Sequence, residues 1–174
     1  MKNTIFVTGV SGVGKTTVID HLKPLLGADF ELHDFDERGV PDNVDRQWRI
    51  DETKHWTELG LENSGKGIRT IICGFARPSE ITEDDSVGFI LLDADEQTIS
   101  RRLLNRYQVP GSVEGLERTV GKPLEQFVEE NVNFASVLRD EAAGAGVKII
   151  DTSEIPPEQV AQEIVEEITL KMNK

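Results

Sequence analysis

The sequence predicts a single α/β domain over residues 1–174, with three layers (α/β/α) and a mostly parallel, five-stranded sheet. Two observations lead to this prediction. First, short apolar runs that are β-branched or leucine-rich alternate with stretches of helical periodicity, an order typical of parallel sheets covered on both faces. Second, a glycine-rich segment joins the first apolar run to the first helical stretch. A chain of 174 residues has room for one sizeable core, so we expect one domain.

The five predicted strands are apolar runs bounded by turn residues. They cover residues 4–8, 30–34, 69–73, 87–93 and 147–151. Helices are predicted at 15–26, from Asn43 or Asp45 to about 61, at 95–107, at 123–143 and from Pro156 onward. Residues 108–122 contain one proline and three glycines without an apolar period, which predicts a mobile loop.

The glycine-rich segment is the strongest functional signal in the chain. It reads G-x-x-x-x-G-K-[ST] and follows the apolar run Ile5-Phe6-Val7 directly. Its glycines let successive backbone N–H groups point inward at phosphates, while the lysine adds a mobile positive charge and the threonine offers a hydroxyl to Mg²⁺. We therefore predict ATP with Mg²⁺ as the ligand. The predicted cradle consists of Gly9, Val10, Ser11, Gly12, Val13, Gly14, Lys15, Thr16 and the adjoining Thr17.

The charge balance of the chain argues against two classes of partner. Acidic side chains outnumber basic ones by 32 to 19, for a formal net charge of −13. Such a surface opposes non-specific binding to nucleic acid or to an anionic membrane. No apolar run is long enough for a membrane span or a signal peptide, so we expect a cytoplasmic protein. The single cysteine, Cys73, is expected to be a small buried side chain.

Two carboxylates follow the second predicted strand. Asp34 and Asp36 are two residues apart, so both side chains can project to the same side from the carboxyl edge of the sheet. Beside a triphosphate, such carboxylates need Mg²⁺ between them and the phosphates, or an incoming hydroxyl that gives up a proton. We assign Asp34 to the Mg²⁺ side and Asp36 to the acceptor side as base. The alternative is a solvated acidic turn.

Two arginines lie where they could contact a second substrate. Arg49 and Glu52 are three residues apart on the second predicted helix and could pair, either to orient the guanidinium or as an exposed salt bridge. Arg77 follows the third strand in Gly74-Phe75-Ala76-Arg77, where Gly74 permits close backbone approach. An ordinary surface arginine is the alternative. The two tryptophans, Trp48 and Trp56, are expected to pack against the core.

A group of arginines precedes the predicted loop at 108–122. Arg102 and Arg106 are four residues apart and share one face of the third long helix, next to Arg101. In an acidic protein, a local cluster of this kind can stabilise charge on a phosphoryl group during transfer; a solvated helix face is the alternative. The three histidines show no metal-ligand spacing.

Taken together, these motifs resemble the nucleoside- and shikimate-kinase-like branch of the small P-loop kinases over nearly the whole chain. Asp34-x-Asp36 is similar to the shikimate-kinase D-x-D, and Trp48-Arg49-x-x-Glu52 is similar to its F-R-x-x-E. This resemblance implies that Asp36 and Arg49 face the phosphoryl acceptor. It also implies a substrate-binding helical segment at about 38–64 and a lid at about 108–122.

Other motifs resemble a different member of the same superfamily. Gly74-Phe75-Ala76-Arg77 looks like the G-F-P-R of adenylate kinases, which grips a nucleotide phosphate. Arg102-x-x-x-Arg106 resembles the arginine pair at the lid base, and Asp151-Thr152-Ser153 is similar to the stretch that borders adenine. The resemblance thereby implies that Arg102, Asp151 and Thr152 contact the nucleotide, and that Gly74, Phe75 and Arg77 contact the acceptor.

We expect a kinase that transfers the γ-phosphoryl group of Mg-ATP to the hydroxyl of a small molecule. Lys15, Asp36, Arg102 and Arg106 are the predicted catalytic residues, and Thr16 with Asp34 the predicted metal ligands. One alternative is a nucleoside monophosphate kinase. Another is a nucleotide-binding module that hydrolyses slowly or not at all. The chain has no N-K-x-D or T-K-x-D segment, which argues against a regulatory GTPase.

Overall fold

The computed structural model describes residues 2–81 and 86–172 and has the predicted architecture. Five parallel strands form one sheet in the order β2-β3-β1-β4-β5. They are β1 (Thr4–Thr8), β2 (Phe30–Asp34), β3 (Arg69–Cys73), β4 (Val87–Asp93) and β5 (Lys148–Asp151). Four of the five strands begin and end where the sequence predicted, because each is a short apolar run closed by turn residues.

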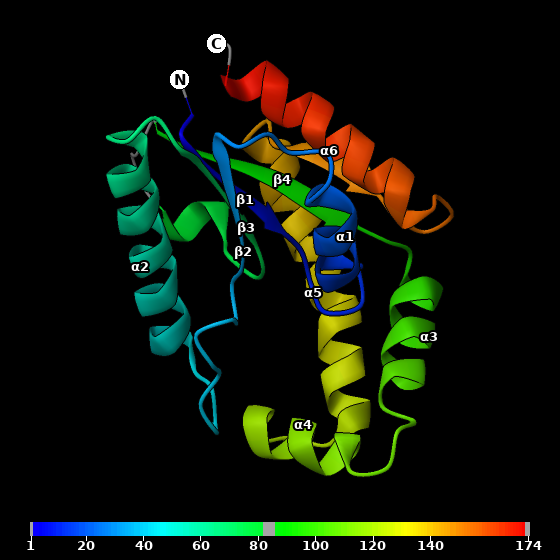
Figure 1. Cartoon of the computed structure of the whole chain (residues 1–174). Helices are drawn as coiled ribbons and strands as arrows, with labels where there is room; N and C mark the ends of the chain where they lie inside the picture. Colours follow the sequence, from blue (N-terminus) through cyan, green and yellow to red (C-terminus); the bar gives the residue numbers. More distant parts are fainter. Residues whose placement is uncertain (1, 82–85, 173–174) are drawn as a thin grey trace.

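Helices cover both faces of this sheet (Figure 1). One face packs against α1 (Lys15–Leu22) and α6 (Pro157–Met172), and the other against α2 (Arg46–Ser64) and α5 (Leu124–Gly144). Helix α3 (Glu96–Arg106) lies outside α5. A short 3₁₀ helix, η1 (Pro78–Glu80), follows β3. None of the described helices is both long and apolar enough to cross a bilayer.

Two predictions about the helices are wrong. Helix α1 ends at Leu22 instead of about residue 26, because Pro24 has no N–H to continue the ladder and Leu25 N turns back to the carbonyl of Leu22. Residues 108–122 are not a structureless loop, since they contain the helix α4 (Ser112–Val120). Gly111 and Gly121 bound this helix in left-handed conformations, so these glycines mark helix ends.

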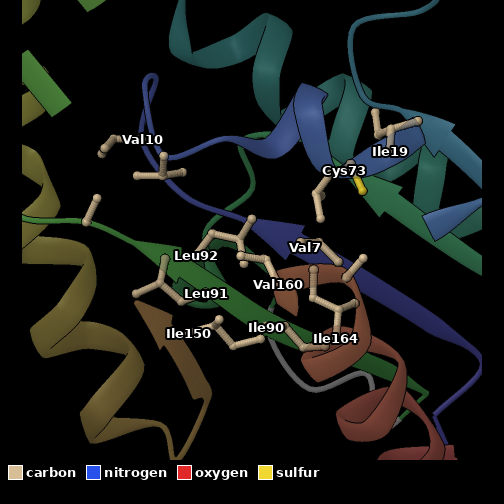
Figure 2. Packing of buried hydrophobic residues seen from close by; sticks show 14 of the residues in the cluster. Val7, Val10, Ile19, Cys73, Ile90, Leu91, Leu92, Ile150, Val160 and Ile164 are labelled. Carbon is tan, nitrogen blue, oxygen red and sulfur yellow. The ribbon is translucent and has the colours of Figure 1, made fainter. Parts of the chain in front are cut away.

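The core consists of two clusters of buried side chains, a larger and a smaller one. Val7 and Ile90 belong to the larger part, together with Val160 and Ile164 of α6 (Figure 2). Cys73 is buried in the same cluster, as predicted, and burial raises the pKa of its thiol to about 12.

The smaller part of the core lies under α2. Phe6, Phe35 and Trp56 are almost fully buried there, and Trp48 packs against them. The indole Nε1 of Trp56 donates to the carbonyl of Phe35, 3.1 Å away, which fixes the chain just past the end of β2. The predicted core packing of both tryptophans is confirmed.

Gly74 is required where the ends of β2 and β3 approach each other. A Cβ atom at this position would lie 1.9 Å from the Cβ of Phe35. We expect Gly74→Ala to lower the free energy of unfolding by about 2 kcal/mol or more, because Phe35 cannot move without disturbing the core. Gly144→Ala is the matched control, since a Cβ there meets no atom within 4 Å. Urea unfolding of both variants tests this, and equal stabilities would contradict it.

Candidate functional site

The glycine-rich loop between β1 and α1 has the conformation of a phosphate cradle. Gly9, Gly12 and Gly14 have φ values of +152°, +91° and +99°, which other residues rarely adopt. A Cβ at Gly9 would lie 2.4 Å from the carbonyl oxygen of Leu92, so the loop can only pass close over β4 with glycine here. Gly14 is the N-cap of α1, whose N-terminal dipole therefore faces the loop.

Lys15 lies inside this loop. Its Nζ donates hydrogen bonds to the carbonyls of Gly9 and Val10, both at 2.8 Å. Burial lowers the pKa of Lys15 to about 8, against the opposing effect of the nearby Asp36 carboxylate. The ammonium group is therefore held by two neutral carbonyls, which an anionic ligand could replace.

Arg102 ties α3 to the loop and to the end of β5. Its guanidinium donates to the hydroxyl and the carbonyl of Thr152, at 3.0 and 2.6 Å, and to the carbonyl of Gly12 at 3.3 Å. The hydroxyl of Thr152 in turn lies 2.9 Å from the carbonyl oxygen of Val13. These contacts brace the loop from behind.

A first cavity, of about 410 Å³, opens at the loop, and we call it the P-loop cavity. Residues 11–18 form its floor, and α3 and the segment after β5 form its walls. The predicted site residues Thr16, Thr17, Arg102, Arg106 and Thr152 line it. Asp151 is not among its lining residues, because its carboxylate turns back to accept hydrogen bonds from the backbone and hydroxyl of Ser153.

The carboxylates after β2 have different surroundings. Asp36 lines the P-loop cavity, whereas Asp34 accepts a hydrogen bond from the backbone N–H of Asp36 at 2.9 Å and lines neither cavity. Burial and then the charge of Asp34 raise the pKa of Asp36, while Lys15 acts in the opposite direction. The raised pKa makes Asp36 a stronger proton acceptor than an ordinary aspartate.

A second cavity, of about 970 Å³, lies next to the first, and we call it the wide cavity. Ser11, Asp36 and Arg106 line both cavities, so the two spaces meet at these three side chains. The wide cavity is bounded by residues of α2, α4 and α5 together with the segments after β2 and β3. Predicted site residues Val10, Arg49, Phe75 and Arg77 line it, whereas Gly74 packs beneath it against Phe35.

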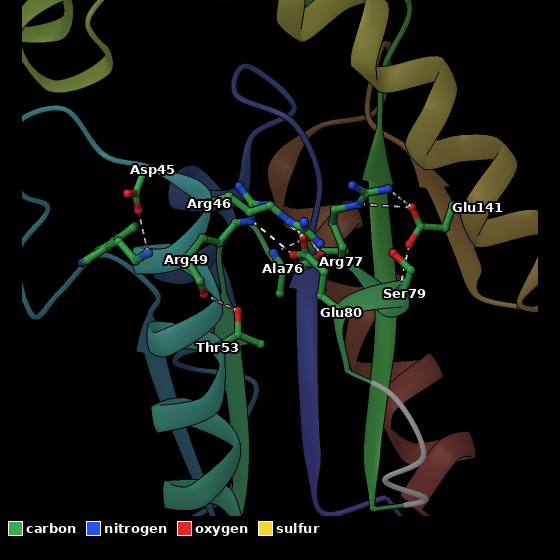
Figure 3. A network of polar contacts seen from close by, with 11 residues as sticks. Asp45, Arg46, Arg49, Thr53, Ala76, Arg77, Ser79, Glu80 and Glu141 are labelled. Atoms are coloured by element: carbon green, nitrogen blue, oxygen red, sulfur yellow. Dashed lines mark hydrogen bonds and ion pairs between the residues drawn. The ribbon is translucent and has the colours of Figure 1, made fainter.

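Arg49 does not pair with Glu52, contrary to the sequence prediction. Its Nη2 donates to Oε1 of Glu80 at 2.9 Å, and its Nε to Oε2 at 3.3 Å (Figure 3). Glu52 pairs instead with Arg38 at 3.0 Å. The spacing on α2 allowed the first pairing, but the fold brings η1 against the N-terminal turn of this helix and offers a closer carboxylate.

Arg77 also has a carboxylate partner from a distant element. Its Nε and Nη2 donate to Oε2 of Glu141 on α5, at 3.3 and 2.9 Å (Figure 3). Oε1 of the same glutamate accepts the backbone N–H of Ser79 at 2.9 Å. Glu141 therefore joins α5 to η1 beside the wide cavity.

Helix α4 forms part of the wall of the wide cavity and contacts the segment before α2. The backbone N–H of Val44 donates to the carbonyl of Thr119 at 2.9 Å, and that of Asn43 to the carbonyl of Arg118 at 3.3 Å. Leu116 of α4 is buried against the cavity. Helix α4 lies at the opposite end of the molecule from both termini (Figure 1).

Three residues of the site were not predicted from the sequence. Asn131 of α5 accepts the backbone N–H of Ser11 through Oδ1 at 2.9 Å, and so anchors the tip of the loop. Glu80 and Glu141 hold the arginines described above. No local pattern distinguishes these three from other polar residues of an acidic chain, because their partners are 31 to 120 residues away.

The loop, the parallel sheet and the braced helices together define a P-loop fold of the kinase type. Comparison with known proteins agrees with this class. Residues 5–121 match the family described as the AAA domain, and the chain belongs to this family.

Two curated proteins illustrate the range of relatives. The chain is 30% identical to "Adenylate kinase" from Thermoplasma acidophilum over 187 residues, which cover 94% of this chain and 97% of that protein. It is 32% identical to "Probable gluconokinase" from Dictyostelium discoideum over 123 residues, which cover 60% of this chain. The second match spans 62% of the gluconokinase, somewhat less than two thirds of its length.

Solved structures with the same fold include two shikimate kinases. The enzyme from Acinetobacter baumannii, in complex with shikimate, aligns with a TM-score of 0.54 at 19% identity, over 100% of this chain and 97% of that chain. The enzyme from Aquifex aeolicus aligns with a TM-score of 0.52 at 18% identity, over 95% and 96% of the two chains. At these identities the likeness concerns the fold.

The brace behind the loop can be tested through the Thr152 hydroxyl. We expect Thr152→Val to lower the free energy of unfolding by about 1 to 3 kcal/mol, because it leaves part of the half-buried Arg102 guanidinium and the carbonyl of Val13 without a partner. Thr169→Val on α6 is the control, since that hydroxyl is exposed and contacts only the carbonyl of Val165. Thermal unfolding gives the loss of stability in both variants, and equal losses would contradict the proposed role of the Thr152 hydroxyl in bracing the loop.

Proposed function

We propose that this chain is an ATP-dependent phosphotransferase that moves the γ-phosphoryl group of Mg-ATP to the hydroxyl of a small molecule. One observation carries the proposal: a cavity at the P-loop and a second cavity meet at Ser11, Asp36 and Arg106. A donor phosphate in the first and an acceptor in the second would therefore come together beside a carboxylate and a guanidinium. The kinase relatives support the same reaction type.

The residues on the P-loop side fit a nucleoside triphosphate. The backbone of residues 11–14 and the helix N-terminus supply N–H groups, and Lys15 can exchange its two carbonyl partners for phosphate oxygens. Arg102 and Arg106 face the same cavity from α3, where a guanidinium stabilises charge on a transferring phosphoryl group. The remaining wall, beyond Thr152, is available to the base and ribose.

The donor set also fits Mg²⁺. Thr16 offers a hydroxyl oxygen in the P-loop cavity, and Asp34 offers a carboxylate outside both cavities, next to Asp36. Within residues 2–81 and 86–172 no three acidic, histidine or cysteine side chains gather as a metal cage, which suits an ion held mainly by substrate phosphates and water. When bound, Mg²⁺ would neutralise the charge that develops between the β- and γ-phosphates.

On the acceptor side, Asp36 would take the proton of the attacking hydroxyl. The acceptor oxygen forms a bond to the γ-phosphorus while the bond between this phosphorus and the bridging oxygen breaks, and the electron pair leaves with ADP. The raised pKa of Asp36 improves it as a base at neutral pH as long as it remains ionised. Helix α4 and the segment at 42–44 would limit water entry.

A nucleoside monophosphate kinase is the second candidate. The relative that covers 94% of this chain is an adenylate kinase, and four arginines line the wide cavity. In that case the acceptor is already an anion and needs no base. Acceptor-dependent ADP release, measured with hydroxyl compounds and with nucleoside monophosphates, separates the two. A nucleotide-binding module without transfer activity would release no additional ADP with any acceptor.

Lys15→Ala tests the donor site. It removes the charge nearest the predicted phosphates but little packing, so we expect turnover to fall by about 100-fold or more, equivalent to about 3 kcal/mol of transition-state stabilisation. The control Lys23→Ala removes an exposed ammonium at the end of α1 and should retain activity. Turnover of both variants is measured as steady-state ADP release, and circular dichroism confirms that they are folded. Near wild-type turnover in Lys15→Ala would overturn the donor-site assignment.

Asp36→Asn tests the acceptor base and its pH dependence. The raised pKa in the ligand-free protein predicts that wild-type kcat/KM falls as the pH drops through a value above 3.8, because the carboxylate is then protonated and cannot accept the hydroxyl proton. The variant should lose most of its kcat together with this acidic limb, while ATP binding is largely kept. The control Asp20→Asn changes an exposed carboxylate on α1. An unchanged kcat in Asp36→Asn would favour the monophosphate kinase.

A further inference from the structure

The wide cavity has an unusual distribution of charge. Besides Arg106, which lies where the two cavities meet, Arg46, Arg49 and Arg77 line it, and these three alone would make it a site for an anionic acceptor. All three, however, already contact carboxylates of Glu80 and Glu141 (Figure 3). The charge that an acceptor meets therefore depends on these two glutamates.

Glu80 holds two arginines at once. Oε1 accepts from Nη2 of Arg49 at 2.9 Å and from Nε of Arg46 at 3.1 Å, and Oε2 accepts from Nε of Arg49 at 3.3 Å. The side chain of Glu80 is only 5% exposed. Burial acts to raise its pKa, but the hydrogen bonds of Arg49 and Arg46 outweigh burial and hold the pKa below the usual value. Glu80 is therefore a carboxylate at neutral pH.

Two of these arginines, Arg49 and Arg77, are also covered by an aromatic ring. The guanidinium of Arg49 lies 5.0 Å from the centre of the Phe75 ring, and that of Arg77 lies 5.3 Å from the centre of the Phe134 ring. One face of each guanidinium is thus on a ring, and its Nε–Nη2 edge is on a carboxylate. Within the described residues, Nη1 of both arginines has no protein partner and can donate to an uncharged oxygen.

An anionic acceptor would be opposed by this arrangement. To use the bidentate edge of Arg49, a phosphate or carboxylate would have to displace Glu80, which would leave a buried carboxylate without its partners. If it did not displace Glu80, it would lie beside that negative charge. An anion at Arg77 would likewise have to displace Glu141 or lie beside its negative charge. The carboxylate of Glu141 also accepts a hydrogen bond from the backbone N–H of Ser79. An uncharged acceptor neither displaces a glutamate nor is repelled by one.

The remaining wall of the wide cavity is rich in aromatic rings. Six aromatic residues line it: Phe35, Trp48, Phe75, Tyr107, Phe127 and Phe134. Three pairs among them are in ring contact, with ring centroids 6.1, 5.8 and 6.4 Å apart. Such walls favour a flat apolar body, which packs against rings better than a polyol does.

We propose that the wide cavity binds an uncharged alcohol with a flat aromatic ring, a nucleoside being the model compound, and that Glu80 and Glu141 set this specificity by neutralising Arg46, Arg49 and Arg77. The inference rests on the proposed phosphoryl transfer and specifies its acceptor. The acceptor hydroxyl attacks the γ-phosphorus, its proton passes to Asp36, and ADP leaves with the electron pair of the broken bond. Glu80 and Glu141 act on the acceptor only through the arginines.

The first experiment compares acceptors with the wild-type chain. ADP release is measured with ATP, Mg²⁺ and three kinds of probe: the common nucleosides, their 5′-monophosphates, and the ring-free or non-aromatic hydroxy acids gluconate and shikimate. We expect one or more nucleosides to exceed both anionic classes in kcat/KM by about tenfold or more. A preference for a monophosphate or a hydroxy acid would overturn the inference and leave phosphoryl transfer established.

The second experiment removes the neutralising charge. In Glu80→Gln, and separately in Glu141→Gln, kcat/KM for the monophosphate should rise about tenfold relative to the matching nucleoside, mainly through a lower KM. A purely structural role would lower activity with both acceptors alike. Glu58→Gln is the control and should leave the ratio unchanged, because Glu58 is an exposed residue of α2 that forms an ion pair with Lys54 away from the cavity lining.

The outcomes separate this inference from the proposed function. Because the wild-type comparison needs no variant, the inference remains testable if Glu80→Gln fails to fold, and Glu141→Gln provides a second charge removal on another element. An unchanged acceptor ratio in a folded Glu80→Gln and Glu141→Gln would refute the role of the glutamates. No acceptor-dependent ADP release, despite ATP binding, would overturn the proposed function and the inference with it.

Discussion

The positive charge of Lys15 is the constraint on which the rest of the site depends. Its ammonium is buried, so its pKa is lowered to about 8, and the protein must supply oxygen partners to keep the charge. The carbonyls of Gly9 and Val10 do so, which requires the backbone path that the loop glycines allow. Asp36 stabilises the same charge through space. Loop shape, lysine charge and strand-end carboxylate therefore form one electrostatic unit.

Charge in this protein is compensated locally rather than by the surface as a whole. The chain carries a net charge of −13, yet at the wide cavity Arg46 and Arg49 share the carboxylate of Glu80, and Arg77 pairs with Glu141. Isolated surface pairs contribute little to stability, but Glu80 is buried and uses both oxygens, so its contacts also fix the position of η1 relative to α2. The same contacts determine the electrostatic potential that a ligand meets in the cavity.

The sequence predicted the parts of the molecule that depend on local patterns. Strand limits follow from runs such as Arg69–Cys73, and the cradle follows from a motif whose residues are all neighbours in the chain. Helix α4 was missed because glycines inside and beside it obscured the spacing of Val113, Leu116 and Val120. The partner of Arg49 was predicted wrongly because Glu52 is close in sequence, whereas Glu80 becomes close only when β3 and η1 pack beside α2. Long-range pairings of this kind require the fold.

The contact between α4 and the segment at 42–44 has a consequence for how such a protein can diverge. It is made by main-chain groups, the N–H groups of Asn43 and Val44 and the carbonyls of Arg118 and Thr119. Main-chain hydrogen bonds survive most side-chain substitutions, provided that the backbone path is kept. Leu116 and Val120 of α4 can therefore change in size or polarity while the wall they belong to stays attached. Descendants of one ancestral chain could in this way acquire different ligands by drift at a few cavity positions, without having to rebuild the enclosure around them.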